Sequence, residues 1–122
     1  MSTAGGRGAL PVTVAINLDG DTFGFHEVML VSVMNIAEHE VAVFGLCNLQ
    51  VRGRRDGQWW RVWHVDCSRE RRATTWIAPG DTVQFELTTE AWAGVSYPDF
   101  DAFHLRYLGA VSQPFRLDPG RR

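Results

Sequence analysis

Two cysteines are the residues of this 122-residue chain best placed for chemistry. Each lies on one strand of a predicted β-hairpin, at the end away from the turn. The segments Cys47–Val51 and Gln58–Val65 alternate between apolar and polar residues, and Asp56-Gly57 between them is a strong signal for a tight turn. Thiols at the strand ends opposite the turn would be close enough to form a disulfide. We therefore predict a Cys47–Cys67 disulfide, worth ~3 kcal/mol on the chain-entropy model. Two reduced, buried thiols are the alternative.

Other reactive side chains do not form a recognisable catalytic or metal-binding pattern. The two thiols lack the CxxC spacing of a structural zinc site, and the histidines follow neither HxH nor HExxH. The four histidines are His26, His39, His64 and His104. No nucleophile elbow, phosphate loop or dinucleotide turn occurs, and Asp99 and Asp101 stand in a connection of a domain too small to offer much of a cleft. We predict no catalytic residue, no metal, no cofactor and no enzyme activity.

Arginine and tryptophan residues around the predicted hairpin form the strongest candidate for a binding surface. Exposed aromatic side chains beside arginine are typical of protein-interaction hot spots. We assign this role to Arg54, Arg55, Trp60, Arg61 and Trp92. The alternative for Trp92 is a packing role at the end of the domain. Basic residues beside tryptophan also occur in single-strand binders, but the net charge of −2 argues against nucleic acid.

The periodicity of the chain predicts short β-strands throughout and no significant helix. The central run 28–34 is apolar on both faces and rich in β-branched residues, which favours a strand over a helix. Trp59, Trp63, Val65 and Cys67 are expected to face inward. The predicted strands are 11–18, 22–35, 41–51, 58–65, 82–87, 103–108 and 111–117.

Seven to eight such strands with turn signals between them indicate an all-β, antiparallel sandwich, with a closed barrel as the alternative. We expect a flexible tail over residues 1–9, one domain over 10–117 and a second tail over 118–122. No apolar run is long enough to cross a membrane, and the first residues lack the apolar core of a signal peptide. The cysteine pair favours an oxidising compartment, whereas this start favours the cytoplasm.

The order of these motifs resembles a known family. It runs Cys47, Leu49, Gly57-Gln58-Trp59, Cys67 and Pro79-Gly80, followed by Phe103-His104-Leu105-Arg106-Tyr107. It is similar to the immunoglobulin-like domains of bacterial lipoproteins and cell-envelope proteins, over roughly residues 10–117. The intracellular proteinase-inhibitor domain of bacilli has a similar layout without the cysteines. The resemblance implies an immunoglobulin-like sandwich whose shared motifs are structural and not catalytic.

These observations together predict a non-catalytic binding or structural module of the cell envelope with a protein partner. The alternatives are a cytoplasmic inhibitor-like or regulatory domain and a structural subunit of a filament or virion. We expect no nucleic acid partner and no membrane insertion. The sequence leaves the oligomeric state open.

Overall fold

The computed structural model describes residues 11–67 and 73–121, and the regular secondary structure in this part of the chain is almost wholly β-strand. The predicted all-β class is therefore confirmed. The described helical structure is one turn, α1 (Ala93–Ser96), which lies shortly before Asp99 and Asp101. The predicted tail 1–9 and residues 68–72 lie outside the described residues.

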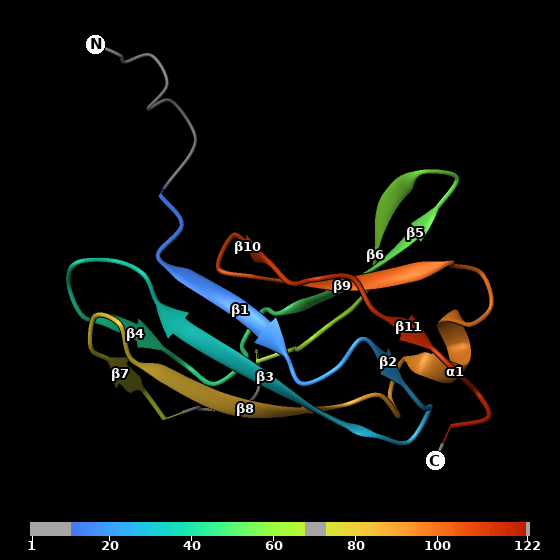
Figure 1. Cartoon of the computed structure of the whole chain (residues 1–122), viewed down its shortest axis with the longest axis horizontal. Coiled ribbons are helices and arrows are strands. Elements are labelled where there is room, and N and C mark those ends of the chain that lie inside the picture. The colour runs from blue at the N-terminus through green and yellow to red at the C-terminus, as the bar shows by residue number, and fades with distance from the viewer. Residues whose placement is uncertain (1–10, 68–72, 122) are drawn as a thin grey trace, which may run out of the picture.

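The strands form two larger antiparallel sheets and two short pairs (Figure 1). The three-stranded sheet has the order β1-β3-β8 and the four-stranded sheet the order β10-β9-β5-β6. β2 pairs in parallel with β11, and β4 pairs antiparallel with β7. The strands are β1 (Val14–Leu18), β2 (Thr22–Phe23), β3 (Val28–Asn35), β4 (Val41–Val43), β5 (Gln50–Arg55), β6 (Gln58–His64), β7 (Thr75–Ile77), β8 (Thr82–Thr88), β9 (Ala102–Tyr107), β10 (Ala110–Val111) and β11 (Arg116–Leu117).

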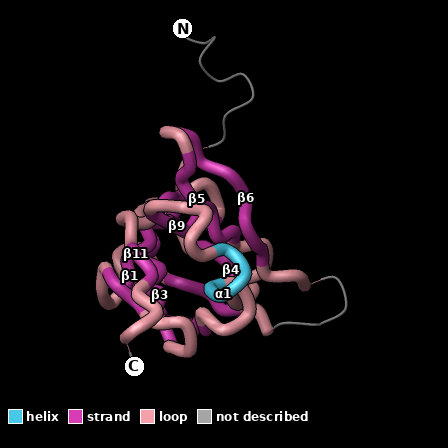
Figure 2. The backbone as a smooth tube through the Cα atoms, turned by 90° about the vertical axis from the view of Figure 1, so that its right-hand side faces the viewer, coloured by secondary structure: helices cyan, strands magenta, loops and turns pink. Residues whose placement is uncertain are grey.

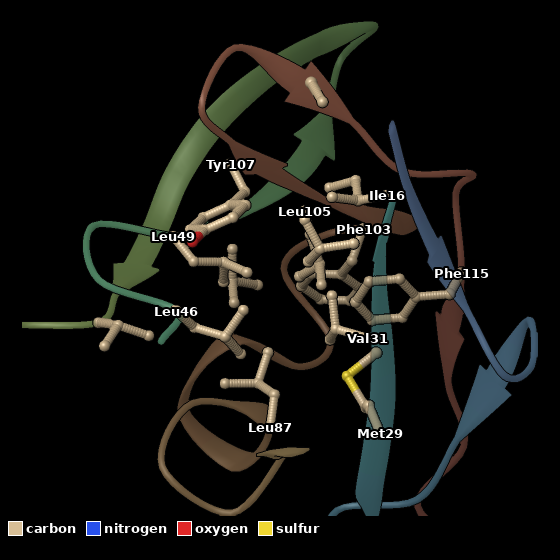
Figure 3. Packing of buried hydrophobic residues seen from close by; sticks show 14 of the residues in the cluster. Ile16, Met29, Val31, Leu46, Leu49, Leu87, Phe103, Leu105, Tyr107 and Phe115 are labelled. Atoms are coloured by element: carbon tan, nitrogen blue, oxygen red, sulfur yellow. The ribbon is translucent and has the colours of Figure 1, made fainter. Parts of the chain in front are cut away.

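Both larger sheets bury apolar side chains in one common core. Met29 and Val31 of β3 lie opposite Phe103 and Leu105 of β9, with Phe115 beside them (Figure 3). Alternation explains this packing, because every second side chain of a strand points to the same face. The prediction that residues 28–34 form a strand is confirmed, since β3 is the middle strand of its sheet.

The predicted turn at Asp56-Gly57 is also confirmed. It joins β5 to β6, and both residues have positive φ angles, 55° and 76°. Two positive φ angles are the signature of the type I′ turn, whose twist matches that of a hairpin. The hairpin extends beyond the rest of the described chain in both views (Figures 1 and 2). It therefore presents its side chains on both faces.

The single strand predicted over residues 22–35 is wrong, because the chain leaves the extended conformation between β2 and β3. The carboxylate of Glu27 accepts a hydrogen bond from the amide of Gly24 (2.6 Å), which closes a local turn. The hydroxyl of Thr89 fixes this turn from outside, since it accepts from the Glu27 amide and donates to the Gly24 carbonyl. This turn separates β2 from β3, and β2 pairs with β11.

The single strand predicted over residues 41–51 is wrong for a similar reason. β4 ends at Val43, and Gly45 and Asn48 adopt positive φ angles of 59° and 65°. These are left-handed conformations that glycine and asparagine accept at low cost. Cys47 therefore lies in a turn before β5 and not within a strand.

Candidate binding surface

The sulfur atoms of Cys47 and Cys67 lie at disulfide-bonding distance, 2.15 Å apart, with Cα atoms 5.6 Å apart. The predicted proximity of the two cysteines is thus confirmed, although both stand just outside the hairpin strands. The turn that carries Cys47 is also held by Tyr107, whose hydroxyl donates to the Gly45 carbonyl (2.5 Å). Burial raises the pKa of Tyr107 to about 12, so this hydroxyl stays a donor at neutral pH.

The projecting hairpin carries an arginine held between two aromatic rings. The guanidinium carbon of Arg55 lies 5.6 Å from the ring centre of Trp60 and 5.3 Å from that of Phe100. Phe100 can occupy this place because Gly53 beneath it has no side chain: a Cβ atom there would overlap the ring. Trp60 is 47% exposed. The result is an ordered cation beside an accessible aromatic surface.

Arg54 is held on the opposite face of the same hairpin. Its guanidinium lies 5.7 Å from the ring centre of Trp59 and makes an ion pair with Asp101 (3.0 Å). The backbone reinforces this contact, since the Asp101 amide donates to the Arg54 carbonyl (3.0 Å). Both arginines at the hairpin tip are therefore positioned by neighbours from the segment before β9.

The outer face of the four-stranded sheet is rich in positive charge. Strand register places Arg52 of β5 opposite both Arg61 of β6 and His104 of β9, so these side chains share one face. Arg106 lies on the same face, two residues beyond His104 on β9. Arg54, at the hairpin tip, is paired with the carboxylate of Asp101.

His104 lies beneath this charged layer in its neutral form. Its ring stacks on Trp59, with centroids 3.7 Å apart, and the residue is only 8% exposed. Burial, together with the positive charges of Arg52 and Arg106, lowers the pKa of His104 to about 4. Its Nε2 atom has no hydrogen-bond partner within the described part of the chain. His104 therefore adds no charge at neutral pH.

Four of the five predicted partner-binding residues come together on or beside the hairpin: Arg54, Arg55, Trp60 and Arg61. The fifth, Trp92, is fully buried (0% exposed), so the prediction that it faces a partner is wrong. It packs against Phe103 and Phe115 because the turn of α1 directs it into the core.

The prediction that Trp59 faces the core is also wrong, whereas Trp63 does pack against the core. The cause is an irregularity in the β5–β6 pairing between Val51 and Arg52, which leaves one extra residue in β6 and reverses the alternation beyond it. A bulge of this kind has no clear signal in a single sequence.

Sequence reasoning did not assign Arg52, Phe100, His104 and Arg106 to the binding surface. The alternation of side chains along a strand could have placed Arg52 and Arg54 on one face of β5. In the same way it could have placed His104 and Arg106 on one face of β9. The pairing of β9 with β5, however, joins segments about fifty residues apart and is a long-range feature.

A groove of about 290 Å³ lies beside the outer edge of β6. Its lining includes the apolar side chains of Trp63, Val65, Phe85 and Leu87 and the polar residues Glu86 and Thr88. β6 is the last strand of its sheet, and within residues 11–67 and 73–121 no strand pairs with its outer edge. Backbone donors and acceptors along this edge are therefore open to an added strand.

The described residues contain no group of three or more histidine, cysteine, aspartate or glutamate side chains that could hold a metal ion. No helix among them is long and apolar enough to span a membrane. Comparison with protein-family models and with curated proteins finds no match to this chain. The assignment of a function accordingly depends on the geometry of the surface.

Proposed function

We propose that this chain is an immunoglobulin-like β-sandwich of seven to eight principal strands and a non-catalytic binding module for a protein partner. The observation that carries the proposal is Arg55 held between Trp60 and Phe100 on a hairpin that projects from the body. Hot spots combine such aromatic and arginine side chains. An arginine already ordered by its neighbours loses less entropy when it binds than a free one.

The proposed setting is extracytoplasmic. The two sulfur atoms at bonding distance support it, because disulfides form and persist in oxidising compartments. A small domain also gains most from such a link, since its core alone is modest. Free thiols in the protein isolated from its native compartment would contradict this part of the proposal, and thiol titration in denaturant measures them.

A selection from displayed random peptides tests the binding role. The immobilised domain should enrich peptides that bind about tenfold more weakly to Trp60→Ser, because truncating a hot-spot residue costs at least that much. Trp76→Ser is the matched control, since Trp76 is also exposed (63%) but lies on β7. Thermal unfolding of both variants checks that they remain folded. The proposal fails if no peptide is enriched, or if enriched peptides bind the two variants equally.

A further inference from the structure

We infer that the partner segment is an extended strand of alternating acidic and apolar residues that adds to the outer edge of β6. This inference rests on the proposed function and specifies its site and its partner. Three features of the described chain meet at this edge: unpaired backbone groups, a positively charged face and a groove whose lining includes large apolar side chains.

The unpaired edge accounts for an extended conformation of the partner. β6 runs over seven residues, Gln58–His64, and pairs with β5 on one side only. A peptide laid along the other side would make backbone hydrogen bonds of the kind found throughout the sheet, a recurring mode of peptide recognition. The hairpin that carries β6 projects from the rest of the described chain (Figures 1 and 2).

We infer acidic residues at alternate positions of the partner strand from the charge of the outer face. An added strand would turn every second side chain toward the face that carries Arg61, with Arg52 and Arg106 on the strands behind it. Carboxylates at these positions would form charge-assisted hydrogen bonds with guanidinium groups. His104, which lies beside Arg52 and Arg106, is neutral and adds no charge to this face.

We infer apolar residues at the remaining positions of the partner strand from the opposite face. Trp60 is exposed on that face, because it pairs with Gly53, which lies under Phe100. Further along β6, the groove between Trp63 and Phe85 opens beside the edge. Apolar side chains of the added strand would enter this groove and cover Trp60, which removes apolar surface from water.

Titration calorimetry with a capped peptide of about nine residues tests the inference, a length that matches an ordinary strand. The peptide alternates Glu and Val. We expect it to bind, and we expect a peptide with Lys in place of Glu, or with N-methyl groups on alternate amides, to bind at least tenfold more weakly. Arg61→Gln should weaken binding roughly fivefold to tenfold. Asn17→Asp, on the exposed face of β1, is the control because it changes the net charge equally.

Two outcomes would overturn the inference and leave the proposed function standing. The first is enrichment, in the display selection, of peptides that need Trp60 but carry no acidic residues. The second is tight binding of the N-methylated peptide, which would exclude pairing with β6. Binding of an oligothymidylate of about twelve nucleotides at the Arg61 face, without binding of the acidic peptide, would overturn the inference and the proposed protein partner together.

Discussion

The strongest quantitative prediction concerns the stability of the fold between pH 7 and pH 4. His104 is neutral in the folded protein because its ring is buried under Trp59 and lies near Arg52 and Arg106. Its pKa falls from 6.5 to about 4 on folding. The unfolded chain therefore binds a proton at a pH where the folded chain does not, and acid favours unfolding.

The size of this effect follows from the pKa change. A tenfold change in proton affinity is worth about 1.4 kcal/mol, so the fall from 6.5 to about 4 corresponds to at most about 3–4 kcal/mol. The free energy of unfolding should keep this contribution above pH 6.5, lose it progressively as the pH falls, and lack it below about pH 4. Water around the exposed arginines reduces the measured value below this limit.

Urea unfolding of the wild type and of His104→Gln at pH 7 and pH 4.5 measures the effect. The variant loses the stacking contact at every pH but cannot take up the proton. The difference in free energy of unfolding between wild type and variant should therefore be about 2 kcal/mol smaller at pH 4.5 than at pH 7. His64→Gln is the control, because His64 is exposed on the same sheet. An equal gap at both pH values, or an NMR titration of the His104 ring near pH 6.5, would refute the reasoning.

Three further predictions concern stability and use chemical denaturation. Reduction, or replacement of Cys47 and Cys67 by serine, should cost about 3 kcal/mol, since the link closes a loop across 20 positions; an unchanged midpoint in reductant would show that the link contributes nothing. Asn35→Ala should cost about 2–4 kcal/mol, because its buried amide joins three backbone groups, one on β7 and two in the turn that follows β3, whereas a loss below 1 kcal/mol would contradict that role. Gly53→Ala should cost about 1–3 kcal/mol by displacing Phe100, and the cost should largely disappear in a Phe100→Ala background.

Local pattern predicted the features that depend on neighbouring residues. The apolar run of β3, the alternation of β8 and the Asp56-Gly57 turn were all recognisable, because strand periodicity and turn chemistry act over a few residues. The proximity of the two cysteines followed from the hairpin, since its register brings the open ends together.

Features that depend on remote contacts were not predictable in the same way. The strand predicted over 22–35 is interrupted because Glu27 and Thr89 together close a turn, and Thr89 is 62 positions away. Trp92 was indistinguishable from an exposed tryptophan until the fold placed it against Phe103. In each case a contact distant in sequence overrides the local preference.

The sequence by itself determined that this protein is built of strands, where its main hairpin turns and that Arg54, Arg55, Trp60 and Arg61 stand together on it. Only the tertiary structure decided which face each side chain occupies. The reason is physical: one extra residue in β6 reverses the alternation, and the pairing of β9 with β5 brings Arg106 and His104 onto the arginine face. The surface for which we propose a partner exists only once those strands are paired.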